Sequence, residues 1–180
     1  MTVIVGIKHK GIIYIGCDSQ GSGGWEKRNR QDSKIFISHG IGYGFTSSYR
    51  MGQIIKFHSE EVHSPISRKA DVYGYVVRSL VPMYRRILGE HGYKQTVNGE
   101  ETGGTFLVAI DGRLFCIEPD FQVGEVVEEY DSVGCGAQYA LGSLFSYSNV
   151  DPVKRINKAI DAANAFSNGC GGETKTIKVG

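Results

Sequence analysis

Three polar residues near the start of the chain are of the types that hydrolysis of an amide bond requires. Asp18 follows Thr2 by 16 residues, and Lys34 follows it by 32. If Met1 is removed, Thr2 carries a hydroxyl nucleophile beside an α-amine, a group whose pKa of about 8 lies far below that of lysine. Such an amine can act as the base for the hydroxyl without a separate histidine. A charged Lys34 would favour the neutral amine and help to form the nucleophile, while Asp18 would keep Lys34 oriented and charged.

Strands are expected to position these three residues. Residues 2–9 and 11–19 are rich in valine and isoleucine and are joined at Lys10 and Gly11, which is a hairpin signal. Asp18 ends the second strand, and Lys34 begins a third at 34–40. If the three strands lie side by side, both charges fall near the start of the first strand. We therefore expect Thr2, Asp18 and Lys34 to meet.

The rest of the chain alternates between strand and helix patterns without an internal repeat or a linker, which indicates a single domain over 1–180. Helices segregated from mostly antiparallel strands indicate an α+β class. One economical arrangement stacks two sheets and covers each outer face with a helix pair, giving a four-layer αββα sandwich. The further elements are a strand at 41–48, helices at 50–61 and 68–92 with a kink at Pro82, a hairpin at 103–120 around Asp111-Gly112, a strand at 124–134, helices at 136–147 and 152–167, and a strand at 173–179.

Composition excludes several classes of function. The chain is 41% hydrophobic and 22% charged, as in ordinary globular proteins, and its net charge of +1 argues against a nucleic-acid or membrane binder. The basic stretch 26–30 is expected to be a solvated loop, and the glycine-rich stretch 21–24 a flexible loop near a substrate cleft. The four cysteines form no C-x-x-C pair, and no signal peptide is evident, so we expect reduced thiols and a cytoplasmic protein.

The spacing of Thr2, Asp18 and Lys34 resembles that of the active-site Thr, Asp and Lys of proteasome β subunits and of their bacterial relative HslV. Membership in the N-terminal nucleophile (Ntn) hydrolases and the αββα fold are what this resemblance implies. It also implies that the Thr2 hydroxyl attacks a peptide carbonyl with its own amine as base, and that Lys34 and Asp18 act as an electrostatic pair. The matching segments span nearly the whole chain: "TVIVGIKHKGIIYIGCDSQ", "SKIFISHGIGYGFTSS", "DSVGCGAQYALG" and "SNGCGGETKTIKV".

The chain departs from the family pattern around the terminal amine. Cys135 stands where the family usually has the serine of a Gly-Ser-Gly turn, and Cys170 where it often has serine before the final Gly-Gly. Ser167 takes the place of a nearby aspartate. A thiol is a weaker hydrogen-bonding group than a hydroxyl, so these catalytic positions predict reduced activity or a different network around the amine. The resemblance also implies an oxyanion donor in a backbone N–H, for which Ser48 is the closest position and Ser47 the neighbour.

Two other roles for the cysteines are open. Cys135 lies at a predicted helix start, where a thiol pKa is lowered, and could itself be a nucleophile. Cys135 and Cys170 could also form a redox-sensitive disulfide if both approach the Thr2 amine. No cofactor is expected to be required. The resemblance implies a possible structural Na⁺ or Mg²⁺ on backbone carbonyls of Asn164, Ser167 and Cys170.

The resulting hypothesis is a threonine-type endopeptidase with a polypeptide substrate, working inside a homo-oligomeric ring or double ring and fed by an ATP-dependent unfoldase. One alternative is a non-catalytic ring or scaffold subunit that retains Met1. Another is an Ntn amidase acting on a small molecule. The state of Met1 separates the first two hypotheses.

Overall fold

The first sheet holds the N-terminal strand at its centre. A computed structural model describes residues 1–59, 71–148 and 151–180. The hairpin expected at Lys10-Gly11 is present: both residues have positive φ, at 50° and 77°, as a type I′ turn requires. Four antiparallel strands follow one another across this sheet in the order β12 (Tyr130–Gly134), β1 (Val3–His9), β2 (Ile12–Cys17) and β13 (Lys175–Val179).

The second sheet is built from two further type I′ hairpins. His39-Gly40 and Asp111-Gly112 both have left-handed conformations at the turns, as their sequence predicts. All five strands are antiparallel to their neighbours. Their order is β11 (Val123–Glu125), β10 (Arg113–Ile117), β9 (Phe106–Ile110), β6 (Ile41–Phe45) and β5 (Ile35–Ser38).

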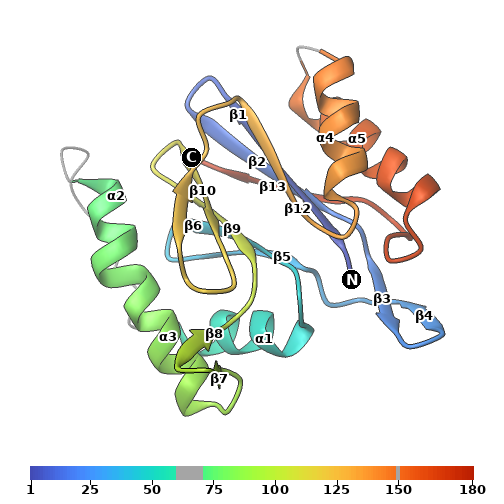
Figure 1. The fold of residues 1–180 in the computed structure, drawn as a ribbon. Coiled ribbons are helices and arrows are strands. Elements are labelled where there is room, and N and C mark those ends of the chain that lie inside the picture. Colours follow the sequence, from blue (N-terminus) through green and yellow to red (C-terminus); the bar gives the residue numbers. More distant parts are fainter. Residues whose placement is uncertain (60–70, 149–150) are drawn as a thin grey trace.

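Helices cover the outer face of each sheet, so the predicted four-layer αββα sandwich is confirmed (Figure 1). In one helix pair the second helix begins at the N-cap Asp151, whose side chain accepts from the N–H groups of Val153 and Lys154. That pair is α4 (Ala137–Ser146) and α5 (Pro152–Phe166), packed on the first sheet. On the second sheet lie α1 (Tyr49–His58), α2 (Val72–Tyr75), the π-helical segment η1 (Val76–Leu80) and α3 (Val81–Glu90).

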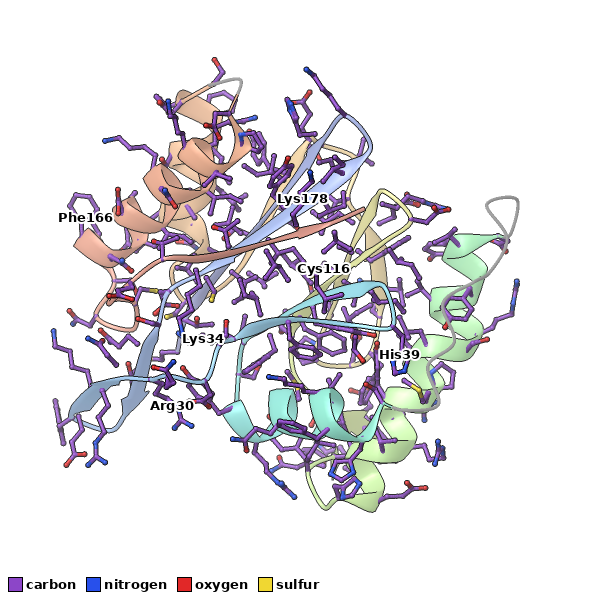
Figure 2. All side chains as sticks on the ribbon, turned by 180° about the vertical axis from the view of Figure 1, so that it is seen from behind. Arg30, Lys34, His39, Cys116, Phe166 and Lys178 are labelled. Atoms are coloured by element: carbon purple, nitrogen blue, oxygen red, sulfur yellow. The ribbon has the colours of Figure 1, made fainter. Side chains whose placement is uncertain are left out.

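Three apolar layers separate the four structural layers. The middle layer lies between the sheets and joins Ile4 and Ile15 of the first sheet to Leu107 and Leu114 of the second. Cys116 projects into the same region (Figure 2). Because apolar side chains fill the space between the sheets, the two sheets are held at a fixed separation.

Several predicted elements differ in detail. The strand expected at 124–134 is two strands, β11 and β12, which belong to different sheets. The crossing between them is held by Lys8, whose Nζ donates to the carbonyls of Val126 and Val127 at 2.7 and 3.1 Å. Pro82 lies in a helical run from Val72 to Glu90 that no non-helical residue interrupts. It follows a wide π turn in which the Val81 N–H donates to the Val76 carbonyl, so the missing Pro82 N–H is accommodated.

Two stretches that were predicted to be loops form the two strands of one hairpin. Residues 21–24 and 26–30, expected to be loops, fall largely within β3 (Gln20–Gly23) and β4 (Glu26–Asn29), which pair and project from the sandwich (Figure 1). A second small hairpin joins β7 (Gln95–Val97) and β8 (Glu100–Thr102). The predicted helix ends at 60–61 and 68–70 lie outside the described residues. Within the described part of the chain, no helix has the length and apolar character needed to cross a membrane.

Candidate active site

Thr2 is fixed in place by its backbone. It directly precedes β1 and is almost fully buried, with 2% of its surface exposed. The Gly136 N–H donates to the Thr2 carbonyl at 3.2 Å. Gly134 has a φ of +101°, and a Cβ there would lie 2.3 Å from that carbonyl oxygen, so only glycine fits beside Thr2. The turn after β12 thus holds Thr2 directly in front of β1.

Asp18 is fully buried, and its carboxylate accepts hydrogen bonds from three backbone N–H groups. It follows β2, and its Oδ1 accepts from the Val3 N–H at 3.0 Å. Its Oδ2 accepts from the N–H groups of Gln20 and Gly171 at 3.3 and 3.2 Å. Three backbone donors fix the orientation of this buried carboxylate and compensate part of its lost hydration. Asp18 therefore presents a fixed carboxylate beside Thr2.

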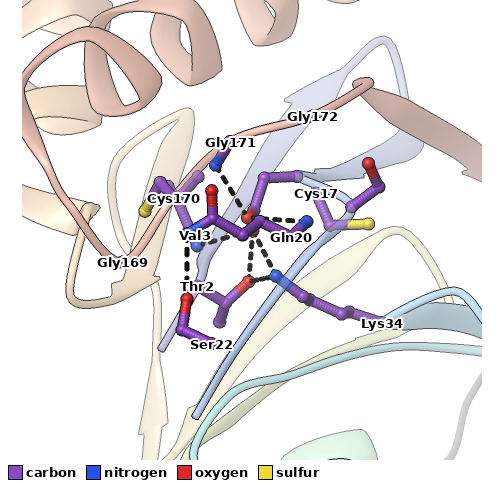
Figure 3. A network of polar contacts seen from close by, with 12 residues as sticks. Thr2, Val3, Cys17, Gln20, Ser22, Lys34, Gly169, Cys170, Gly171 and Gly172 are labelled. Atoms are coloured by element: carbon purple, nitrogen blue, oxygen red, sulfur yellow. Dashed lines mark hydrogen bonds and ion pairs between the residues drawn. The ribbon is translucent and has the colours of Figure 1, made fainter. Parts of the chain in front are cut away.

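Lys34 completes a trio with these two residues. Its Nζ donates to Thr2 Oγ1 and to Asp18 Oδ1, both at 2.6 Å, and only 2% of the side chain is exposed (Figure 3). The Thr2 hydroxyl in turn donates to Asp18 Oδ1. A lysine buried to this degree needs a counter-ion, and Asp18 supplies it. The hydroxyl oxygen thus faces a cation, which would stabilise a negative charge on Oγ1.

The route by which Lys34 reaches Thr2 differs from the prediction. The three strands do not lie side by side in one sheet: β1 and β2 belong to the first sheet, while Lys34 precedes β5 at the edge of the second. The Lys34 carbonyl accepts from the Phe45 N–H at 3.0 Å, which ties it to β6. Figure 2 shows Lys34 where the chain leaves the β3–β4 hairpin for the second sheet. The trio therefore spans the gap between the sheets.

The three positions that depart from the family pattern also come together. The Thr2 N–H donates to Cys135 Sγ at 3.3 Å, and Cys135 Sγ lies 3.8 Å from Cys170 Sγ. The Ser167 hydroxyl donates to Cys135 Sγ at 3.7 Å. Cys170 is buried, and burial raises the pKa of its thiol to about 12. Among the described residues, the hydrogen-bond partners of Cys135 are Thr2, Ser167 and Cys170, and none of these is a histidine that could act as a base.

A cavity of about 220 Å³ opens beside the trio, lined by Thr2, Lys34, Ser47, Ser48 and Tyr49, with Met1 at its margin. The Ser48 N–H, expected to be the oxyanion donor, points instead to the Thr46 carbonyl at 2.6 Å. Ser48 is also the N-cap of α1, where its hydroxyl accepts from Arg50. Its neighbour Ser47 has a left-handed φ of 64°, so this turn is strained next to the cavity.

Comparison with solved structures places this fold. Over 98% of the chain and 97% of the other protein, it superposes with a TM-score of 0.77 and 18% identity on Thiobacillus denitrificans BPH in complex with epoxomicin. Eukaryotic HslV from Trypanosoma brucei gives a TM-score of 0.70 at 13% identity, over 98% of each chain. The Anbu (Gly-1) mutant from Hyphomicrobium sp. strain MC1 gives 0.68 at 14% identity, over 99% of this chain and 81% of the other. No profile of a known protein family and no curated protein sequence matches the chain.

This is a proteasome-like Ntn-hydrolase fold. In this fold both sheets come together at the start of β1, where Thr2, Asp18 and Lys34 lie. The structure also contains contacts that sequence reasoning missed. The buried Gln20 side chain donates to the Asn168 carbonyl at 3.0 Å, and the Gly171 N–H reaches Asp18. These contacts tie the loop at 168–172 to the carboxylate.

The residues expected to hold a cation, Asn164, Ser167 and Cys170, lie at the end of α5 and in the loop that follows it. The Asn164 Oδ1 is buried without a hydrogen-bond partner in the described structure, while its Nδ2 donates to the Gly172 carbonyl at 3.5 Å. The Ser167 carbonyl accepts from the Cys170 N–H at 3.1 Å and keeps a second lone pair. An oxygen acceptor left without a donor suits a hard cation, so the residues present fit Na⁺ or Mg²⁺.

Proposed function

We propose that the protein is a threonine-type peptidase of the proteasome and HslV kind, with Thr2 as its nucleophile once Met1 has been removed. The observation that carries the proposal is the contact of Lys34 Nζ with Thr2 Oγ1 at 2.6 Å inside a buried ion pair with Asp18. This arrangement supports a hydroxyl that can lose its proton while its oxygen stays beside a cation.

The steps follow from the groups at the site. The freed Thr2 amine takes the hydroxyl proton, and Oγ1 attacks the peptide carbonyl to form an acyl ester while the leaving amine receives the proton. Water then hydrolyses the ester with the same amine as base. Ser48 can supply its N–H to the oxyanion only when that N–H leaves the Thr46 carbonyl, which requires the turn at Ser47 to open. Cys135, which accepts from the Thr2 nitrogen, would orient the amine.

Assembly is part of the proposal. We propose a homo-oligomeric ring or double ring that acts on a polypeptide substrate with an ATP-dependent unfoldase. The proteasome-like fold supports the ring, because a ring would enclose the peptidase site and keep it from other proteins. All four cysteines are free, which suits the reducing cytoplasm. A Na⁺ or Mg²⁺ held by Asn164 and the Ser167 carbonyl would brace the loop at 168–172.

A non-catalytic ring or scaffold subunit that retains Met1 is the second candidate, and the engagement of the Ser48 N–H by the Thr46 carbonyl favours it. While Met1 remains, Thr2 has an amide in place of the basic amine. An Ntn amidase would share the chemistry and differ only in its substrate, so hydrolysis of small amides but not of peptides would identify it.

Mass spectrometry of the natural N-terminus, followed by labelling with a peptide epoxyketone, tests the proposal. That reagent reacts with a free amine and a hydroxyl together, so we expect one adduct on Thr2 and no adduct on Thr2→Ala. Retention of Met1 in all natural material would instead exclude the peptidase mechanism and leave the scaffold role. Loss of Met1 with no adduct, and with peptide hydrolysis unchanged in Thr2→Ala, would exclude Thr2 as nucleophile.

A further inference from the structure

The two cysteines beside the Thr2 nitrogen form a pair with unequal access to solvent. Their Sγ atoms are 3.8 Å apart, although 35 residues separate them in the chain. Cys135 is exposed, whereas Cys170 is 4% exposed. The other two cysteines have no sulfur partner: Cys17 Sγ contacts the Ser33 hydroxyl, and Cys116 Sγ donates to Glu118. An oxidant from solvent would therefore react first with Cys135, and the Cys170 thiol lies next to it.

The local backbone allows the two sulfurs to approach. A disulfide has an S–S distance of about 2.05 Å, so the gap must close by about 1.8 Å. Cys135 lies in the turn between β12 and α4, and Cys170 in the loop between α5 and β13, so neither is fixed within a regular element. Glycines line both sulfurs: a Cβ at Gly169 would lie 2.4 Å from Cys135 Sγ, and one at Gly136 would lie 2.6 Å from Cys170 Sγ. A residue larger than glycine at position 136 or 169 would therefore occupy the space that these sulfur atoms now take.

We propose that Cys135 and Cys170 are an oxidation site for hydroperoxides, at which a reversible disulfide switches off the Thr2 centre. The Cys135 thiolate attacks the peroxide O–O bond, giving a sulfenic acid and releasing an alcohol, or water when the reagent is hydrogen peroxide. Cys170 then attacks the Cys135 sulfur, and the sulfenic oxygen leaves as water with the Cys170 proton. The two thiols lose two electrons and two protons in total, and these reduce the peroxide.

Oxidation reaches the active site through contacts already present. Cys135 Sγ accepts from the Thr2 nitrogen at 3.3 Å, and a sulfur turned toward Cys170 would leave that contact. Cys170 directly precedes Gly171, whose N–H donates to Asp18 Oδ2 at 3.2 Å. Closing the disulfide would therefore disturb both the nitrogen that acts as base and the carboxylate that holds Lys34. The regulatory part of this inference rests on the proposed peptidase function, whereas the formation of the disulfide does not.

The test treats the full-length protein with hydrogen peroxide and maps peptides under non-reducing conditions. We expect a single cross-link between the peptides of Cys135 and Cys170, with free thiols in the denatured protein falling from four to two. Cys116→Ser should form the same cross-link, and Cys135→Ser and Cys170→Ser should not form it. In Cys170→Ser we expect Cys135 to proceed to sulfinic acid, because the resolving thiol is missing. Sulfinic acid on Cys135 in the wild type without a cross-link, or pairing with Cys17 or Cys116, would overturn the proposal.

A second readout concerns the consequence for Thr2. Labelling of Thr2 by the epoxyketone should fall at least tenfold on oxidation and recover with dithiothreitol. Cys135→Ser and Cys170→Ser, each compared with its own untreated state, should show no loss that dithiothreitol restores. A complete cross-link with undiminished labelling would refute the switch. If Thr2 is not labelled in any state, the proposed function fails, while the peptide map still decides whether the oxidation site exists.

Discussion

At the scale of the residue, the buried pair of Lys34 and Asp18 decides both stability and chemistry. Each charge has lost its water and is compensated by the other, with backbone N–H groups on the carboxylate as additional donors. Removing one member of such a pair leaves an unpaired buried charge, which is costly, whereas removing both together is much less so. The site can therefore hold a cation beside Thr2 only because Asp18 is equally buried.

The first prediction is a double-mutant cycle on this pair. Asp18→Asn and Lys34→Met should each lower the free energy of unfolding by about 3–5 kcal/mol, because each leaves one uncompensated charge. The double variant should lose at least 1 kcal/mol less than the sum, since neither charge remains. Urea denaturation measures all three. Glu26→Gln, in an exposed pair with Arg28, is the matched control and should change stability by less than about 1 kcal/mol. Additive losses at positions 18 and 34 would contradict this account of the pair.

A second prediction concerns Asp131 on β12. Burial, together with the nearby Glu118 and Glu128, raises the pKa of Asp131 in the folded protein. The folded state therefore holds this proton more tightly than the unfolded state, and stability falls as pH rises from the ordinary aspartate range through the raised pKa. Asp131→Asn should remove that part of the pH dependence and unfold at higher urea than the wild type at pH 7, with the difference vanishing in acid. The exposed Asp161→Asn is the control, and an equal shift there would contradict the prediction.

At the scale of the element, the predictable parts of the fold are those with local signals. The hairpins at Lys10-Gly11 and Asp111-Gly112 and the helix expected at 152–167 all appear. The hairpin at Asn98-Gly99 was missed although its turn residues are typical, because its strands carry no apolar alternation and are mostly exposed. The hairpin β3–β4 is polar on both strands and gave no signal for the same reason.

The sequence predicts which residues form the candidate site but not which sheets they come from. Thr2, Asp18 and Lys34 do meet, but the sequence does not show that Lys34 arrives from a second sheet. The sheet to which a strand belongs depends on which strand edges form hydrogen bonds, and the similar apolar patterns of β1, β2 and β5 do not distinguish these pairings. The Gly171 N–H on Asp18 also leaves no trace in the sequence, because a backbone donor is independent of side-chain type.

A third prediction follows from the close approach of the sheets. A Cβ at Gly42 of β6 would lie 2.4 Å from Val179 Cγ2 of β13. Gly42→Ala should therefore lower the free energy of unfolding by about 1–3 kcal/mol and shift the sheets apart, slowing the labelling of Thr2 by the epoxyketone. Gly23→Ala is the matched control, because nothing lies within 4 Å of a Cβ there. Unchanged labelling in a folded, destabilised Gly42→Ala would show that the site does not depend on this spacing.

At the scale of the whole molecule, the exposed aromatic residues point to assembly. Trp25, the single tryptophan, stands fully exposed at the tip of the β3–β4 hairpin. Phe166 lies on the outer side of the α4–α5 layer (Figure 2). Its ring is tilted by 32° relative to that of Tyr139, with the ring centroids 5.9 Å apart. Large exposed side chains of this kind often mark contacts with other proteins, and a ring of like subunits would cover them.

The fourth prediction uses Trp25 as a natural probe of the proposed ring. On dilution to the monomer, its fluorescence should shift to longer wavelength and be quenched by acrylamide, because the indole is in water. Assembly at higher concentration should reverse both changes, and Trp25→Ser should sediment as smaller species. The matched control is Val127→Ser, which removes another exposed apolar side chain away from the hairpin. An oligomer whose Trp25 is quenched as easily as in the monomer would place the contact elsewhere.

The division of the trio between the two sheets has a consequence for the life of the newly made chain. Thr2 and Asp18 belong to one half of the sandwich and Lys34 to the other, so no partly folded intermediate with undocked halves contains the complete site. If the protein is the peptidase proposed above, its site is therefore completed only when the two sheets dock, while the chain's own peptide bonds are being buried. Removal of Met1 is then the step that remains before Thr2 can act.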